Sequence, residues 1–138
     1  MTGVAQAGVL DTSVFIATET PRPLDATRMP DELATTVVTL AELQTGVLSA
    51  RTADIRAHRL ATLDAVGDMT VLPADEEAAR MWARLRVHLV ETGRRVRINA
   101  LWIAAIAAIA ASRELPVVTQ DDDFDALAGA ANLVVIRV

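Results

Sequence analysis

Four carboxylates come shortly after runs of apolar or β-branched residues, far apart in the chain: Asp11, Glu42, Asp121 and Asp123. Such runs are typical of buried strands, and the carboxyl ends of parallel strands meet at one edge of a sheet, where ligands bind. Carboxylates within about 4–6 Å of one another repel, so either some are protonated or a cation lies among them. Oxygen ligands that leave room for water favour Mg²⁺ or Mn²⁺ over zinc. The pattern therefore predicts a site for a hard divalent cation.

Helix capping offers a simpler explanation for two of these acids. Asp11 precedes two hydroxyl residues, either of which can cap a helix entered at Val14, and Asp11 itself fits a capping position. Glu42 completes the pattern Thr39-x-x-Glu42 of a capping box, in which the carboxylate only binds a backbone N–H. Both interpretations still place the acids where a helix follows a strand, at the same edge of the sheet, and the sequence leaves them open.

The acidic segment 121–125 contains two kinds of aspartate. For Asp122 and Asp125 we expect a solvated turn, in which one aspartate caps a short helix. Asp121 and Asp123 instead follow the carboxyl end of an apolar strand, as Asp11 does. Three strand ends that deliver carboxylates to one edge are hard to explain by capping alone.

Strand and helix patterns alternate along the chain. Strands are predicted to end at Leu10 and to cover 34–39, 69–72, 115–119 and 133–136. Helices are predicted from Thr39 to about residue 50, and over 52–66, 74–91 and 98–112, the last apolar nearly all round and therefore buried. This alternation predicts one three-layer α/β domain over residues 1–138, with about five mostly parallel strands flanked by helices.

Composition excludes several classes of protein. The 138 residues contain no cysteine, which removes disulfides and thiolate chemistry and fits a reducing cytoplasm, where we expect the protein to act. No apolar stretch is long enough to span a membrane, and the start does not resemble a secretory signal. A net charge of −5 argues against a general nucleic-acid coat, although a nuclease built on carboxylates can still be acidic.

Four motifs, in order and covering essentially the whole chain, resemble the PIN domain and, more narrowly, the VapC-type toxins of bacterial VapBC toxin–antitoxin pairs. The motifs are Leu10-Asp11-Thr12-Ser13-Val14, Leu40-Ala41-Glu42-Leu43-x-x-Gly46, Arg97-Ile98-Asn99-x-Leu101-Trp102-Ile103-Ala104-Ala105 and Thr119-Gln120-Asp121-x-Asp123-Phe124. The resemblance implies a PIN-like fold and a Mg²⁺- or Mn²⁺-dependent endoribonuclease. It also implies a VapB-type antitoxin as inhibitor, an RNA substrate and a homodimer.

The resemblance also implies roles for individual residues. Asp11 would bind the metal directly, Glu42 would act as a ligand or orient water, and Asp121 and Asp123 would complete the acidic pocket. Supporting hydrogen bonds would come from Thr12, Ser13, Asn99 and Thr119. The implied chemistry is metal-assisted hydrolysis of a phosphodiester bond.

Ala100 departs from the family pattern, because the residue after Asn99 is normally an aspartate that binds the metal. The intact motif on both sides favours a single replacement, such as an engineered one, over gradual decay of the site; a natural variant is the alternative. Loss of a ligand should cost more than the 10–100-fold typical of the groups that surround ligands. We therefore expect this chain to bind metal weakly and to cleave RNA poorly or not at all.

Other side chains have less specific interpretations. The basic residues Arg94, Arg95 and Arg97 precede the helix that carries Ala100, and either contact RNA phosphates or form a solvated loop. Trp82 and Trp102 are predicted to be core anchors. The helices between residues 40 and 66 carry more apolar side chains than the sheet can cover, and an antitoxin helix or a second copy of the chain could bury the rest.

Two other functions compete with the nuclease. A receiver or haloacid-dehalogenase-like phosphoryl-transfer enzyme also has an aspartate after its first strand, but it uses a basic residue, usually Lys, at the phosphoryl site. This chain has no Lys, and Ser13 stands where the dehalogenase pattern has a second aspartate. The other alternative is a non-catalytic PIN-like module that captures antitoxin or RNA, which the alanine at position 100 favours.

Overall fold

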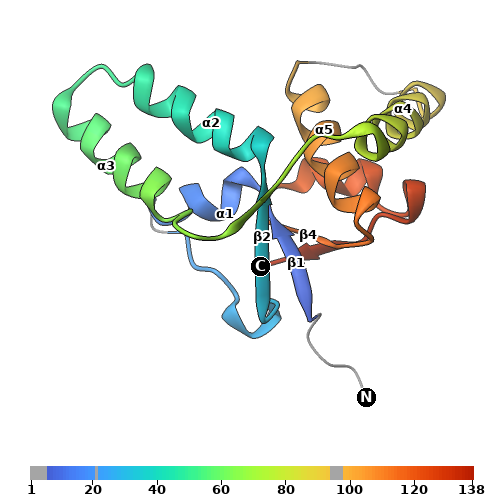
Figure 1. Ribbon diagram of the computed structural model, residues 1–138, viewed down its shortest axis with the longest axis horizontal. Helices are drawn as coiled ribbons and strands as arrows, with labels where there is room; N and C mark the ends of the chain where they lie inside the picture. Colours follow the sequence, from blue (N-terminus) through green and yellow to red (C-terminus); the bar gives the residue numbers. More distant parts are fainter. Residues whose placement is uncertain (1–5, 21, 94–97) are drawn as a thin grey trace.

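A computed structural model describes residues 6–20, 22–93 and 98–138. Five short strands in this part of the chain form one sheet in the order β3-β2-β1-β4-β5, and every pair of neighbours is parallel (Figure 1). The predicted sheet is thus confirmed, and it is parallel throughout. The strands are β1 (Ala7–Leu10), β2 (Glu32–Thr36), β3 (Thr70–Leu72), β4 (Val117–Thr119) and β5 (Val135–Arg137).

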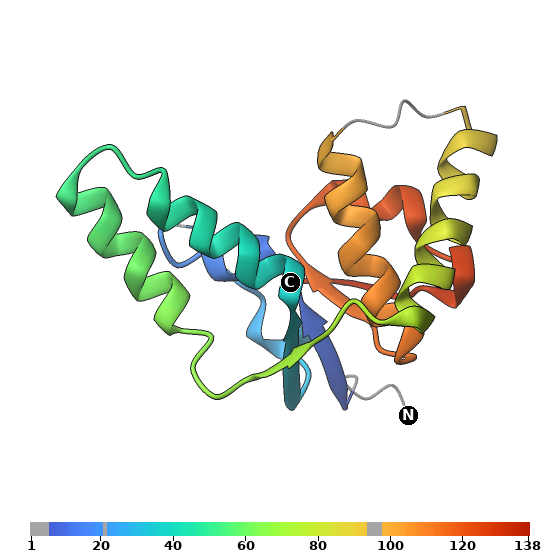
Figure 2. The ribbon, with the colours of Figure 1, turned by 45° about the horizontal axis from the view of Figure 1, so that its top comes forward.

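Helices cover both faces of the sheet, as predicted (Figures 1 and 2). On one side lie α1 (Thr12–Ile16), α2 (Val37–Leu48) and α3 (Ala53–Asp64), and on the other lie α4 (Glu76–Glu91) and α5 (Ile98–Ser112). Three short 3-10 helices complete the described part: η1 (Ala26–Arg28), η2 (Asp122–Leu127) and η3 (Ala130–Asn132). None of the described helices combines the length and the apolar character needed to cross a membrane.

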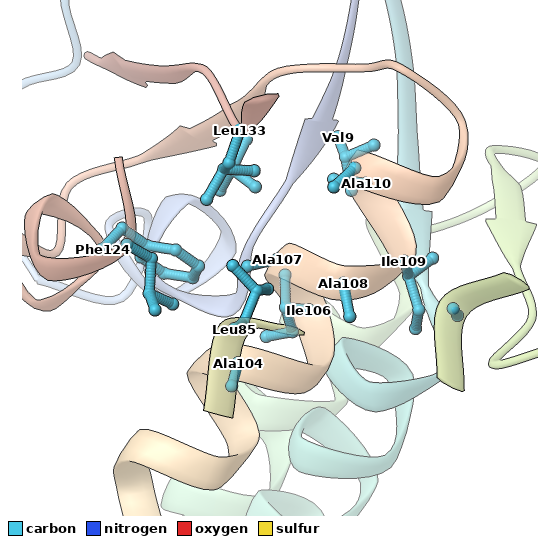
Figure 3. Close-up of a cluster of buried hydrophobic side chains, with 14 of the residues drawn as sticks. Val9, Leu85, Ala104, Ile106, Ala107, Ala108, Ile109, Ala110, Phe124 and Leu133 are labelled. Carbon is cyan, nitrogen blue, oxygen red and sulfur yellow. The ribbon is translucent and has the colours of Figure 1, made fainter. Parts of the chain in front are cut away.

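The larger core lies between the sheet and the α4–α5 pair (Figure 3). The alanines of α5 let α4 approach closely, and Leu85 of α4 is 0% exposed between them. Phe124 of η2 is also 0% exposed in this core, so it anchors the acidic segment that follows β4. A second core on the other face contains Leu10, Val14, Phe15, Leu43, Val66 and Val118.

The boundary between β2 and α2 differs from the prediction. The β-branched run 34–39 was expected to be a strand, but β2 ends at Thr36 and α2 begins at Val37. The hydroxyl of Thr36 accepts a hydrogen bond from the N–H of Thr39 at 3.1 Å, which is the contact of a helix cap. A buried cap therefore overrides the strand preference of three residues.

Close packing at the centre of the sheet requires a glycine in β1. A Cβ atom on Gly8 would lie 2.8 Å from Cγ2 of Val118 and 2.9 Å from Cγ of Pro30. The two contacts come from opposite neighbours of the strand, β4 and the segment before β2, so β1 has little room to move away from either. The strand that carries Asp11 at its end is therefore tightly fixed.

Candidate active site

Asp11 lies at the end of the central strand and is almost completely buried, with 3% of its surface exposed. It occupies the position before the first residue of α1, but its side chain makes no capping hydrogen bond to the helix. Its carboxylate instead accepts a hydrogen bond from the hydroxyl of Ser13 at 2.7 Å. Because α1 begins at Thr12, the predicted helix start at Val14 with Thr12 or Ser13 as the cap is wrong. Both hydroxyl residues are free to act in the site.

Burial raises the pKa of Asp11 to about 6, because a charged carboxylate loses hydration in this position. The hydroxyls of Ser13 and Thr119 act in the opposite direction, and the neighbouring negative charge of Asp121 raises the pKa further. None of the ion pairs among the described residues includes Asp11. The carboxylate thus carries an electrostatic cost that a nearby cation would remove.

Hydroxyl groups join the end of β1 to the end of β4. The oxygen of Ser13 lies 3.2 Å from that of Thr119 and accepts the N–H of Gln120 at 2.9 Å. Since Ser13 donates its one hydroxyl hydrogen to Asp11, the Thr119 hydroxyl is the donor in their contact. The oxygen of Thr119 in turn accepts the N–H of Asp121 at 2.8 Å. Asp11 and Asp121 are therefore held by one connected network.

Glu42 reaches the same region from the second turn of α2. Its carboxylate accepts a hydrogen bond from the hydroxyl of Thr12 at 2.7 Å, which joins α2 to α1. The capping-box interpretation of Thr39 and Glu42 is wrong, because Thr36 caps α2 and Glu42 lies too far inside the helix. Glu42 thus has no capping role that would account for its position.

The four aspartates of the acidic segment after β4 fall into two groups, those that line the cavity and those that do not. Asp121 both lines the site and caps η2, where it accepts the N–H of Asp123 at 2.9 Å. Asp123 is exposed and lines the site as well. Asp122 and Asp125 do not line it and form ion pairs with Arg137.

These elements enclose a cavity of about 240 Å³ at the carboxyl edge of the sheet. Four carboxylates from three separate parts of the chain line it, and the described lining contains no basic side chain. The lining residues are Asp11, Thr12, Ser13, Ile16, Glu42, Asn99, Trp102, Ile103, Ile106, Asp121 and Asp123. Thr119 does not line the cavity, but it holds two lining residues through its hydrogen bonds with Ser13 and Asp121.

The donor chemistry of this cavity fits a hard cation, since its described lining offers carboxylate oxygens and no basic side chain. However, no three Asp, Glu or His side chains among the described residues lie close enough together to form a ligand group. Ala100 is half-buried in the first turn of α5 and does not line the cavity, whereas its neighbour Asn99 does. The described residues thus offer suitable ligand types for a cation, but not a complete ligand group.

Trp102 was predicted to be a core anchor, and this is wrong: 46% of its surface is exposed, at the wall of the cavity. Ile98 and Asn99 at the start of α5 are also exposed, and the buried residues of this helix begin at Ala104. Asn99, Trp102, Ile103 and Ile106 share the face of α5 that lines the cavity, a spacing the sequence already contains. The predicted RNA contacts Arg94, Arg95 and Arg97 lie outside the described residues.

Comparison with known proteins identifies the fold. The family model described as "PIN domain" matches residues 8–130. The chain belongs to the PIN domain family. The predicted resemblance to VapC-type PIN domains is also confirmed by relatives from Mycobacterium tuberculosis. This PIN domain is 68% identical to "Ribonuclease VapC5" over 138 residues, which cover 100% of both chains. It is 39% identical to "Ribonuclease VapC4" over 118 residues, which cover 85% of this chain and 88% of the relative.

A solved structure gives the same result for this PIN domain. It superposes on a chain of the crystal structure of VapBC-5, a member of the VapBC family of toxin–antitoxin systems from Mycobacterium tuberculosis, with a TM-score of 0.85. The two sequences are 67% identical, and the match covers 96% of this chain and 99% of the other.

Proposed function

We propose that this protein is a VapC-type toxin, a Mg²⁺- or Mn²⁺-dependent endoribonuclease that a cognate antitoxin neutralises in the cytoplasm. One observation carries the proposal: a buried aspartate, which forms no ion pair with any described residue, lies in a cavity that three further carboxylates line. The 68% identity to a ribonuclease over the full chain supports it.

The residues of the cavity divide into those that hold the cation and those that orient them. Asp11, Asp121 and Asp123 would hold it, together with Glu42 or water molecules that Glu42 orients. A bound Mg²⁺ or Mn²⁺ supplies an activated water and offsets negative charge on the phosphate that is cleaved. The hydroxyls of Ser13 and Thr12 fix the carboxylates of Asp11 and Glu42 by the hydrogen bonds described above. Thr119 and Asn99 are proposed as further supporting groups, from behind the cavity and at its wall.

Ala100 makes the present chain a weak or inactive form of this enzyme in our proposal. The alanine side chain ends at Cβ, whereas an aspartate would add a carboxylate beside Asn99, which does line the cavity. The lack of a three-member ligand group among the described residues agrees with a missing ligand.

The Ala100→Asp variant tests both parts of the proposal. Incubated with structured RNA and Mg²⁺, it should release discrete fragments, and EDTA should abolish them. The chain with Ala100 should cleave more than about 100-fold more slowly, because loss of a ligand costs more than loss of a supporting group. Ala100→Asn is the matched control, since it has nearly the shape of aspartate without the charge, and it should restore little activity. No gain of Mg²⁺-dependent cleavage in Ala100→Asp would contradict the nuclease.

A non-catalytic module that captures RNA or an antitoxin is the second candidate. The incomplete ligand set favours it for the chain as it stands. It would be supported if Ala100→Asp bound RNA or antitoxin but cleaved no RNA under any divalent cation.

We propose that the α2–α3 hairpin contributes to protein contacts. Leu48 is 82% exposed at its tip, and Ile55 and Leu60 of α3 are each 41% exposed. Exposed apolar side chains on two neighbouring helices can form an interaction surface. A VapB-type antitoxin or a second copy of the chain would cover them, and the structure of the VapBC-5 complex supports the antitoxin as a partner. Light scattering of the isolated chain at increasing concentration tests the homodimer.

A further inference from the structure

Arg137, at the end of β5, contacts the segment that carries Asp121 and Asp123. It pairs in register with Thr119, the last residue of β4. Its Nη1 forms ion pairs with the carboxylates of Asp122 and Asp125, and its Nη2 donates a hydrogen bond to the carbonyl oxygen of Gln120 at 3.2 Å. One side chain therefore contacts three groups of the segment 120–125.

Through Gln120, hydrogen bonds connect Arg137 to the acidic cavity. The N–H of Gln120 donates to the hydroxyl oxygen of Ser13, and the same hydroxyl donates to the carboxylate of Asp11. The side-chain amide of Gln120 also donates to the carbonyl of Pro23 at 3.0 Å and to that of Val138 at 3.4 Å. Arg137 thus acts on a residue whose backbone is one hydrogen bond away from the group that fixes Asp11.

The charge of Arg137 also separates the aspartates of this segment. Three consecutive aspartates repel one another, and a fourth follows at position 125. The guanidinium forms ion pairs with Asp122 and Asp125, neither of which lines the cavity. Asp121 and Asp123 are left to line the cavity.

We propose that Arg137 is a positioning residue for the acidic cavity. It holds the segment 120–125 so that Asp121 and Asp123 line the cavity together with Asp11. The guanidinium suits this task, because its planar fork makes two differently directed contacts at once. The proposal rests on the proposed metal-dependent function, and it concerns the affinity of the cavity for the cation.

The test compares two substitutions of Arg137 in the Ala100→Asp chain. Arg137→Ala removes all three contacts. Arg137→Lys keeps the positive charge but has one nitrogen, which cannot replace both Nη1 and Nη2. Arg80→Ala is the matched control, since Arg80 also pairs with two carboxylates, those of Glu76 and Glu77, on the exposed surface of α4.

Affinity for Mn²⁺, measured by electron paramagnetic resonance, is the main readout, and thermal unfolding in EDTA is recorded for each variant. Arg137→Ala should lower the affinity about 10–100-fold, as expected for a group that orients ligands. Arg137→Lys should give a smaller loss, and Arg80→Ala should give none. RNA cleavage should fall in the same order.

Three results would overturn the proposal: unchanged Mn²⁺ affinity in Arg137→Ala, full affinity in Arg137→Lys, or an equal loss in Arg80→Ala. A lower unfolding temperature with unchanged affinity would show a merely structural role. If Arg137→Ala does not fold, the lysine variant decides. If the Ala100→Asp chain itself neither binds Mn²⁺ nor cleaves RNA, the proposed function fails and this inference fails with it. A normal Ala100→Asp chain with unaffected variants refutes only the inference.

Discussion

Asp11→Asn should make the metal-free protein more stable at neutral pH. In the folded chain the pKa of Asp11 is about 6, against an ordinary value of 3.8. An acid whose pKa is raised by folding favours the folded state while it is protonated, and this advantage is lost as the pH rises from about 4 through 6. Asparagine stays neutral, and its oxygen can still accept the hydrogen bond from Ser13.

The size of the effect follows from the difference between the two pKa values. Each pKa unit corresponds to about 1.4 kcal/mol, so the ionised carboxylate lowers the free energy of unfolding by about 3 kcal/mol above pH 7. Asp11→Asn should recover up to this amount at pH 7.5 and almost nothing at pH 4. An asparagine N–H left without an acceptor would offset part of the gain.

Urea denaturation in EDTA, followed by circular dichroism at pH 4 and pH 7.5, measures both values. Asp68→Asn is the matched control, because Asp68 is exposed in the turn before β3, and it should change stability by less than about 0.5 kcal/mol. A destabilised Asp11→Asn variant at pH 7.5, or a gain that is the same at both pH values, would refute the electrostatic argument.

Two further predictions concern packing, and both are measured by urea denaturation. Leu85→Ala should lower the free energy of unfolding by about 2–5 kcal/mol, since Leu85 of α4 is fully buried in the core against α5, and a change below about 1 kcal/mol would contradict that packing. Gly8→Ala should destabilise by about 1–3 kcal/mol, because the new methyl group would overlap Val118 and Pro30. Gly46→Ala, in a helix with ordinary contacts, should instead stabilise by about 0.5–1 kcal/mol; equal effects at the two glycines would contradict both.

The order and type of the elements followed from hydrophobic patterns, whereas their ends depended on single contacts. The helix Ile98–Ser112 was predicted correctly, because its apolar run is long and uninterrupted. The start of α2 was misplaced, because the buried hydroxyl of Thr36 caps the helix three residues before the predicted one. The last strand was predicted two residues early, because Leu133 enters the core from the end of η3 rather than from a strand.

In the candidate site, too, sequence patterns predicted the general position of residues, whereas individual contacts could not be predicted. Carboxylates at strand ends could be assigned to one edge of the sheet, because parallel strands leave little choice. Arg137 could not be linked to this edge from the sequence, because its contacts depend on the register of β5 against β4. The exposure of Trp102 was missed because an apolar run does not show which part of a helix extends beyond the sheet.

The parallel sheet also determines when the cavity can exist during synthesis. Its walls come from residues near positions 11, 42 and 121 and from one face of α5, and the wall near position 121 is set in place only when β4 pairs with β1. A ribosome that stops before about residue 117 therefore releases a product with no acidic cavity, however well its first three strands have folded. For a protein proposed to cut RNA, such a truncated product would lack Asp121 and Asp123, two of the four carboxylates of the proposed cation site.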